Sequence, residues 1–169
     1  MYYQYSYEKD YLSEFSDQGE ALDKLETGTD LAVLKTGDES IYRYDQMGTH
    51  SYENSSMQTG TNSTSYYFSV ASGDITNFFN EVDLNTPWDY HYENLDSRTI
   101  LDRLAAVKYF VVKAGEEEYL PYGYDTLAAE AEKKDRLYRA YECKNALPIG
   151  YTYDSYIPEE KYAKMSTVE

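Results

Sequence analysis

Cysteine, histidine and long apolar segments are scarce in this sequence, and each absence excludes a class of function. Cys143 is the only cysteine, so the chain forms no internal disulfide and no cysteine-based metal cluster. The two histidines, His50 and His91, lie in polar segments typical of solvated side chains, which argues against a Ser-His-Asp or Cys-His catalytic device. No run of about 18 apolar residues occurs, so no segment is long enough to span a bilayer.

Motifs for catalysis and cofactor binding are absent as well. The sequence has no glycine-rich phosphate loop, no His-Glu-x-x-His, no EF-hand loop and no Gly-x-Ser-x-Gly elbow. Paired carboxylates remain an option, because glycosidases use two of them. Acidic residues in loops or near the ends of expected elements are Asp83, Asp89, Asp96 and Asp125. With 31 acidic residues some pair reaches a suitable distance by chance, so we predict no catalytic residue, no metal site and no cofactor.

Basic residues are few, since 15 Lys and Arg stand against 31 Asp and Glu, which gives a net charge of -16. Such a surface repels phosphate backbones and anionic lipid headgroups, so nucleic acid is not an expected partner. The 169 residues suit one domain, and a chain of this length buries enough surface to fold without a metal or a disulfide. We expect residues 1–169 to form a single soluble domain.

Hydrophobic periodicity in the first half of the chain predicts two helices and two strands. One helix covers residues 9–26 and ends near Gly28. The other follows the cap residue Ser72 and carries an apolar face that includes Phe78 and Phe79. The expected strands are 41–47 and 66–70, and the expected loops are 48–64 and 84–96.

The second half of the chain predicts further strands and two more helices. Ser97 is a cap for the next helix, and Pro158 begins a short last helix that runs to about residue 165. Residues 126–134 are ambiguous, and their alanines and glutamates favour a helix. The expected strands are 107–112, which is buried, and a pair around Lys144-Asn145 formed by 137–142 and 146–153. The pattern predicts an α/β or α+β fold, a layered domain with a mixed β-sheet flanked by helices, ending in a hairpin and a short helix.

Tyrosine is abundant, with 22 of 169 residues. Its ring packs along sheets while its hydroxyl meets water, and the same combination suits the C–H faces and hydroxyls of a sugar ring. Two aromatic groups are candidate sugar contacts, and either group also suits a lid over the core. They are Trp88, Tyr90, His91 and Tyr92 in the loop 84–96, and Tyr122 and Tyr124 beside Pro121 and Gly123.

Several segments, taken together and in order, resemble a known family. The two most specific are Leu-x-x-Val-Lys-Tyr from Leu104 to Tyr109 and Asn-x-Leu-Pro-x-Gly-Tyr from Asn145 to Tyr151. Ser40–Tyr44 and Tyr66–Ser69 precede them at matching spacing. Residues 38–169 thereby resemble the extracytoplasmic part of the YfhO family of bacterial multi-spanning membrane proteins.

The resemblance implies a role at the outer face of the bacterial cell membrane. YfhO-like proteins look like integral-membrane glycosyltransferases that use a polyprenyl-phosphate sugar and decorate cell-envelope polymers such as lipoteichoic acid. Their catalytic acid is expected in an early extracytoplasmic loop that this sequence does not include. The resemblance therefore implies a non-catalytic accessory domain cut from a larger membrane protein. Its implied partners are its own transmembrane region and a cell-envelope glycan or lipid-linked sugar.

Three functions follow from these observations. In the first, the accessory domain contacts the sugar acceptor or donor through its aromatic loops, and Arg43 or Arg98 contacts a phosphate instead of forming an ordinary ion pair. In the second, the chain is a structural module that packs on its own membrane spans, which an exposed apolar patch would favour. In the third, it is a carbohydrate-active hydrolase with a carboxylate pair, one member of which has a raised pKa.

Overall fold

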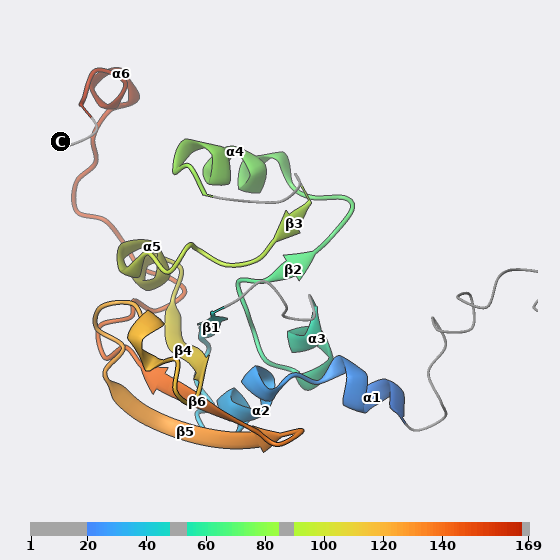
Figure 1. The fold of residues 1–169 in the computed structure, drawn as a ribbon. Coiled ribbons are helices and arrows are strands. Elements are labelled where there is room, and N and C mark those ends of the chain that lie inside the picture. The colour runs from blue at the N-terminus through green and yellow to red at the C-terminus, as the bar shows by residue number, and fades with distance from the viewer. Residues whose placement is uncertain (1–19, 48–53, 85–89, 167–169) are drawn as a thin grey trace, which may run out of the picture.

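The computed structural model describes residues 20–47, 54–84 and 90–166, and its centre is a four-stranded mixed sheet (Figure 1). The strand order is β1-β4-β6-β5. β1 is parallel to β4, whereas β4–β6 and β6–β5 are antiparallel. The strands are β1 (Arg43–Gln46), β4 (Val107–Lys113), β5 (Thr126–Lys133) and β6 (Arg136–Glu142). The predicted mixed sheet with helices is confirmed, as an α+β fold.

The central strand β4 is buried on both faces, as its continuous run of β-branched and aromatic residues predicts. Phe110 and Val112 belong to one hydrophobic cluster, and Tyr109 and Val111 belong to the other. Alternate side chains of a strand point to opposite faces, so two cores form on the two sides of one sheet.

The helix α2 (Gly28–Leu34) covers one face and packs on β4, β5 and β6. Thr27 and Asp30 form a reciprocal capping box, in which each side chain accepts the other's backbone N–H. The Asp30 carboxylate also accepts a hydrogen bond from the hydroxyl of Tyr44 on β1, which ties the helix to the sheet. Gly28 was expected to end a helix, and this prediction is wrong because the capping box makes Gly28 the first residue of α2.

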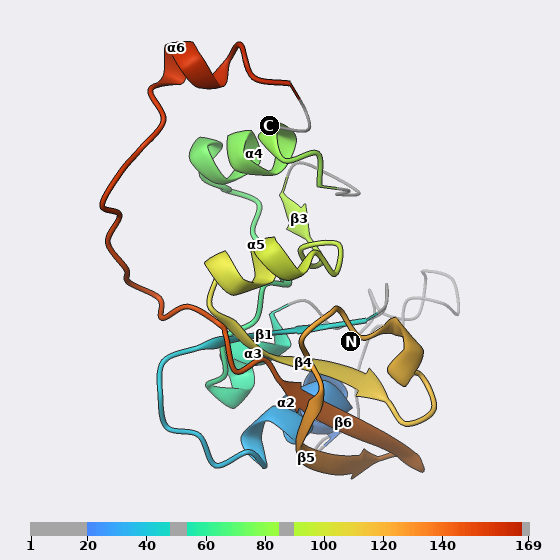
Figure 2. The same ribbon diagram turned by 90° about the vertical axis from the view of Figure 1, so that its left-hand side faces the viewer.

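The opposite face carries α5 (Thr99–Leu104), α4 (Gly73–Glu81) and a separate two-stranded sheet of β2 (Tyr66–Tyr67) and β3 (His91–Tyr92). Figures 1 and 2 both show α5 nearest the main sheet and α4 farther out. The helix after Ser72 is confirmed as α4, although the Ser72 side chain makes no cap hydrogen bond. Ser97 is not the cap of α5, because Arg98 occupies that position.

Three other local predictions are wrong. Residues 126–134 are mostly strand β5, because they pair with β6 along their length and so satisfy backbone groups that a helix would satisfy internally. The hairpin joins β5 to β6 across Lys134-Asp135, while residues 146–153 form no strand. The loop 48–64 contains the helix α3 (Ser55–Thr59).

The chain ends are only partly as predicted. Of the helix expected over 9–26, α1 (Glu20–Leu25) is described and residues 9–19 lie outside the described part. The short last helix is confirmed as α6 (Glu159–Tyr162). Figure 2 shows the segment after β6 passing α5 and reaching α6 on the side of the molecule where α4 lies.

Candidate functional site

A groove of about 520 Å³ lies between β1, α3 and β2, and we call it the aromatic groove. Its volume falls within the range of small-molecule sites. The residues that line it are Arg43, Asn54, Ser56, Met57, Thr61, Asn62, Ser63, Ser65, Tyr66, Tyr67 and Phe68. It therefore combines aromatic rings, hydroxyls, an amide and a guanidinium.

Asn54 holds one wall of the aromatic groove in place. Its Nδ2 donates to the carbonyl oxygen of Tyr67 at 2.8 Å, and its Oδ1 accepts from the Tyr67 N–H at 3.1 Å. The residue sits in the left-handed region with φ 65°, a conformation that asparagine tolerates better than most residues. The Asn54 side chain thereby bonds to β2 as the backbone of a neighbouring strand would, and it holds the start of α3 against β2.

The rings of the groove remain open to solvent. The exposed fraction is 43% for Tyr67 and 59% for Phe68. Tyr67 makes edge-to-face contacts with Tyr90 and with His91 of the adjoining strand β3, at centroid distances of 5.6 and 5.9 Å. The Phe68 N–H donates to the Tyr90 carbonyl, which aligns the two segments. The rings thus have fixed positions and accessible surface.

Polar groups of the groove retain bonding capacity. The hydroxyls of Ser65 and Tyr66 are buried atoms without a hydrogen-bond partner. Arg43 donates from Nη1 to the Ala105 carbonyl at 2.8 Å, which uses one of the five N–H groups of a guanidinium. These two hydroxyls are closed to solvent, so the polar groups that a ligand in the groove can reach include the guanidinium of Arg43 and the side-chain amide of the exposed Asn62. The groove can therefore receive a hydroxyl-rich molecule.

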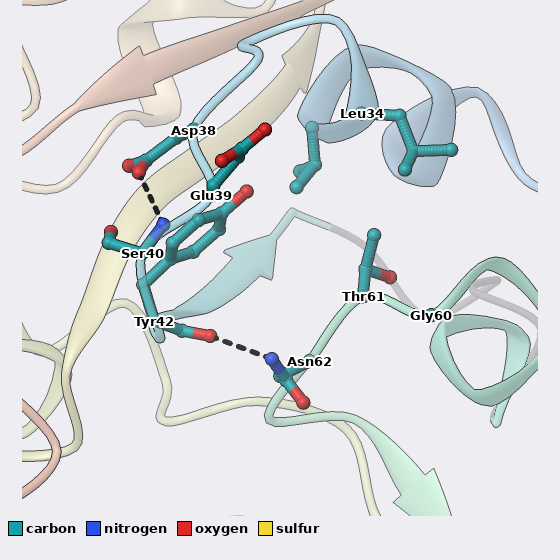
Figure 3. Close-up of a pocket in the computed structure, with 9 residues that line it drawn as sticks. Leu34, Asp38, Glu39, Ser40, Tyr42, Gly60, Thr61 and Asn62 are labelled. Carbon is teal, nitrogen blue, oxygen red and sulfur yellow. Dashed lines mark hydrogen bonds between the residues drawn. The ribbon is translucent and has the colours of Figure 1, made fainter.

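A second pocket of about 230 Å³ adjoins the groove and shares Thr61 and Asn62 with it (Figure 3). On its rim the Asn62 amide donates to the Tyr42 carbonyl at 3.2 Å, and Asp38 accepts from the Ser40 N–H at 2.9 Å (Figure 3). Together the two pockets give a continuous polar and aromatic surface on either side of Asn62.

Asp38 of this second pocket is held as a carboxylate. Burial opposes ionisation, but hydrogen bonds from Lys108, Ser40 and Tyr109 outweigh it and lower the pKa of Asp38 well below its usual range. The Tyr109 hydroxyl donates to the carboxylate at 2.8 Å. Because these hydrogen bonds stabilise the ionised carboxylate, Asp38 fixes the pocket wall and is unsuited to transfer protons.

Two buried carboxylates are the strongest candidates for acid–base chemistry. Asp45 is 1% exposed and Asp102 is 0% exposed. Burial raises the pKa of Asp45 to about 7 and that of Asp102 to about 8, and the charge of Asp45 adds to the second shift. Neither residue lines the groove or the second pocket. A sealed pair cannot reach a substrate in this conformation.

The model of one protein family, described as bacterial membrane protein YfhO, matches residues 2–169. The chain belongs to the YfhO family. No curated protein and no solved structure matches it. Among the described residues no helix combines the length and the apolar character needed to cross a membrane, and no three His, Cys, Asp or Glu side chains form a group suited to a metal ion.

The candidate sugar contacts of this YfhO chain are distributed over different environments. Tyr90 and His91 lie beside the aromatic groove through their contacts with Tyr67. Tyr92 is buried against Phe79 and Tyr66 in the core. Trp88 lies outside the described residues. The structure thus brings only part of this aromatic group to an accessible surface.

The other aromatic candidates lie away from the groove. Tyr124 is buried and donates from its hydroxyl to the Val107 carbonyl at 2.8 Å, so it is a core residue of this fold. Tyr122, at the neighbouring turn, is 91% exposed, and its carbonyl accepts a hydrogen bond from Thr99. Whether any of these residues contacts a sugar stays a prediction.

The two candidate phosphate contacts, Arg43 and Arg98, also lie in different environments. Arg43 lies in the aromatic groove, as described above. Arg98 donates to the carbonyls of Val82 and Asp83 and pairs with Asp96 at 3.3 Å, so it fastens the end of α4 to the start of α5. Its guanidinium is largely occupied by these groups.

The sequence interpretation of this YfhO chain missed most of the groove. The sequence pattern places Asn54 and Asn62 in a polar loop and Tyr67 and Phe68 in a strand, and it predicts a function for none of these four residues. A signal was present, because consecutive strand residues point to opposite faces, so three aromatic residues in a row leave at least one ring outside. The run Tyr66-Tyr67-Phe68 could therefore have been recognised as a partly exposed aromatic surface.

Proposed function

We propose that this YfhO-family chain is a non-catalytic, extracytoplasmic module that contacts a sugar of a cell-envelope polymer or of a lipid-linked donor through the aromatic groove. The observation that carries the proposal is the groove itself, in which the exposed rings of Tyr67 and Phe68 stand beside the guanidinium of Arg43 and the amide of the exposed Asn62. Rings that stack on C–H faces and polar groups that meet hydroxyls form the combination that a sugar requires.

The composition of the groove supports contact and not cleavage. Among the described residues its lining contains no carboxylate, imidazole or thiol, so its serine hydroxyls have no neighbouring base in this part of the chain that would activate them. Arg43 adds a fixed positive charge that suits a phosphate attached to the sugar. In this proposal the transfer reaction, with a polyprenyl-phosphate sugar as donor, belongs to the membrane-embedded part of the parent protein.

Ligand-observed NMR on the 169-residue chain tests the proposal. We would titrate simple hexoses and lipoteichoic-acid fragments against the parent and against a Tyr67→Ala/Phe68→Ala variant. A Tyr119→Ala/Tyr156→Ala variant is a matched control, because it removes two exposed tyrosines that do not line the groove. Saturable binding that only the groove variant loses supports the proposal. Equal binding by all three proteins, or none at millimolar ligand, contradicts it.

A structural module remains the second candidate function, and a specific surface favours it. Large apolar side chains are exposed on α4, on α5 and after β2, namely Val70, Ile75, Phe78, Ile100 and Leu104. Exposed apolar groups gathered on neighbouring elements are typical of interfaces. In this alternative the surface packs on the membrane spans of the same protein.

Site-specific photo-crosslinking in the membrane-embedded parent separates the two functions. A crosslinker placed at Phe78 or Ile100 reacts with the membrane region if the structural module is correct. A crosslinker at Phe68 then gives no such product, because Phe68 lies outside this apolar surface and lines the aromatic groove. Crosslinks to the membrane region from Phe68 alone would argue against both assignments of these surfaces.

A further inference from the structure

Basic residues are concentrated at the tip of the β5–β6 hairpin, which we call the basic hairpin tip. Lys133, Lys134 and Arg136 are three of the 15 basic residues of the chain, and they fall within four consecutive positions. Both turn residues, Lys134 and Asp135, adopt left-handed backbone with φ 51° and 60°, as in a type I′ hairpin turn. This tight turn holds the three cations at one end of the sheet, together with the exposed carboxylates of Glu132 and Asp135.

A cavity of about 370 Å³ lies beside the basic hairpin tip. Its other wall comes from the junction of α1 and α2, where Asp23 and Glu26 line it and the Asp23 carboxylate faces Lys133 and Lys134. The ring of Tyr138 and the backbone of Gly28 also line it, and the two approach each other so closely that no side chain fits at Gly28. The cavity therefore has cations on one side, acceptors on the other and an aromatic ring within it.

The three cations differ in how strongly they are engaged. Lys133 donates to the carbonyls of Asp23 and Glu26, lies 3.5 Å from the Asp23 carboxylate and fastens the hairpin to the helices. Lys134 lies 3.2 Å from the Asp23 carboxylate, and both side chains are more than half exposed, so the pair is weak. Arg136 is exposed, and no side-chain hydrogen bond or ion pair engages it within the described part of the chain. Its planar donor fork matches a phosphate.

We propose that the cavity at the basic hairpin tip binds a phosphate group carried by a hydroxyl-bearing molecule. Arg136 and Lys134 contact the phosphate oxygens, and the carboxylates of Asp23 and Glu26 accept hydrogen bonds from hydroxyls of the same molecule. The acidic wall disfavours a purely anionic ligand, and the basic tip disfavours a neutral one. The site shares no lining residue with the aromatic groove, so it stands or falls independently of the proposed function.

Two sources carry this chemistry, a lipid headgroup and a free or polymer-borne phosphate ester. The net charge of -16 repels both from the surface as a whole. Binding that is localised to residues 133–138 would for that reason report a specific site and not a general attraction of anions.

Amide chemical-shift mapping on the 169-residue chain tests the site. The probes are glycerol phosphate, glycerol alone and inorganic phosphate. A Lys134→Gln/Arg136→Gln variant removes the two available cations. A Lys113→Gln/Lys144→Gln variant makes the same change of charge at exposed positions outside the cavity. Arg136→Lys retains the charge but removes the planar fork.

We expect saturable shifts at residues 133–138 with glycerol phosphate, weaker binding of inorganic phosphate, and no shifts with glycerol. The cavity variant should bind about tenfold more weakly or worse, the control variant should bind like the parent, and Arg136→Lys should lie between them. Absence of shifts at the hairpin, or equal binding by the cavity and control variants, overturns the proposal.

Co-sedimentation with vesicles assigns the source. If phosphatidylglycerol vesicles bring down the parent but not the cavity variant, while phosphatidylcholine vesicles bring down neither, the ligand is a lipid headgroup. If the hairpin binds glycerol phosphate and no vesicle brings the chain down, the ligand is a free or polymer-borne phosphate ester. If phosphatidylglycerol vesicles bring down the parent and the cavity variant to the same extent, this cavity has no role at the membrane.

Discussion

Gly28 lies directly against the ring of Tyr138, so that a Cβ atom at position 28 would overlap three ring carbons. This contact joins the first residue of α2 to β6 and lets the helix approach the sheet. The close approach explains why a buried glycine begins this helix. The position requires a residue without a side chain, and it does not require the conformational freedom of glycine.

Replacing Gly28 with alanine should destabilise the fold. The added methyl group must displace the Tyr138 ring or the helix, and overpacking of this kind costs about 1–3 kcal/mol. Gly73→Ala is a matched control, because Gly73 also begins a helix and a Cβ there meets no atom within 4 Å. We expect that control to be neutral or to stabilise the chain by up to about 1 kcal/mol. Urea unfolding of the three proteins measures both effects, and equal midpoints would contradict the prediction.

The sequence predicted the sheet where one local pattern dominated. The run from Val107 to Val112 is apolar on both faces, and only a central strand gives it two buried faces. The helix favoured over residues 126–134 is wrong because alanine and glutamate prefer helices in isolation, whereas pairing with β6 decides the structure of this segment. The turn at Lys134-Asp135 has no glycine or asparagine, so the hairpin had no strong signal in the sequence.

The candidate site was less predictable than the fold. Arg43 was named from its residue type, but its place in the groove depends on the parallel pairing of β1 with β4, which no local pattern gives. The sequence groups Tyr92 and Tyr124 with Tyr90 and Tyr122 as candidate sugar contacts or as a lid over the core, whereas tertiary packing buries the first two and leaves the other two exposed. A tyrosine suits both positions, so its environment is set by the assembled layers and not by its neighbours in sequence.

The buried pair Asp45 and Asp102 should make the chain less stable as pH rises. Both folded-state pKa values, about 7 and about 8, lie above the ordinary value of 3.8, so the folded protein binds protons more tightly than the unfolded chain. Their stabilising contribution is fully present below about pH 4 and is lost as pH rises through about 8. We expect a loss of several kcal/mol across this window, because a difference of one in pKa corresponds to about 1.4 kcal/mol, and unfolding at several pH values measures it.

Asp102→Asn separates this effect from the other acidic residues. Both oxygens of Asp102 lack a hydrogen-bond partner, so a neutral amide of the same shape replaces the carboxyl without breaking a contact. The variant should show a shallower decline of stability between pH 4 and pH 8 and should exceed the parent in stability at pH 8. A pH profile identical to that of the parent would exclude Asp102 as the titrating group.

Asp38 should have the opposite pH dependence. Its carboxylate accepts hydrogen bonds from Lys108 and Tyr109, and its pKa is lowered, so its contribution is present above about pH 4 and is lost as pH falls further. Asp38→Asn should cost about 2 kcal/mol at pH 7, because charged hydrogen bonds are lost and a Tyr109 hydroxyl is left without its acceptor. The difference from the parent should shrink near pH 2. Asp154→Asn, at an exposed position, is the control and should change the free energy of unfolding neither at pH 7 nor near pH 2.

Asn54 should control the order of the aromatic groove without contributing to the core. Its side chain makes two hydrogen bonds to the backbone of Tyr67, and its φ of 65° suits glycine equally well, so Asn54→Gly removes the bonds without adding strain. We expect amide hydrogen exchange at Tyr67 to accelerate about tenfold, as the loss of about 1.4 kcal/mol of local stability implies, while the Val111 amide in β4 keeps its protection. Affinity for a sugar should fall in the same variant although both exposed rings remain. Unchanged exchange at Tyr67 would show that β2 is held by its pairing with β3 alone, and the groove would then not depend on α3.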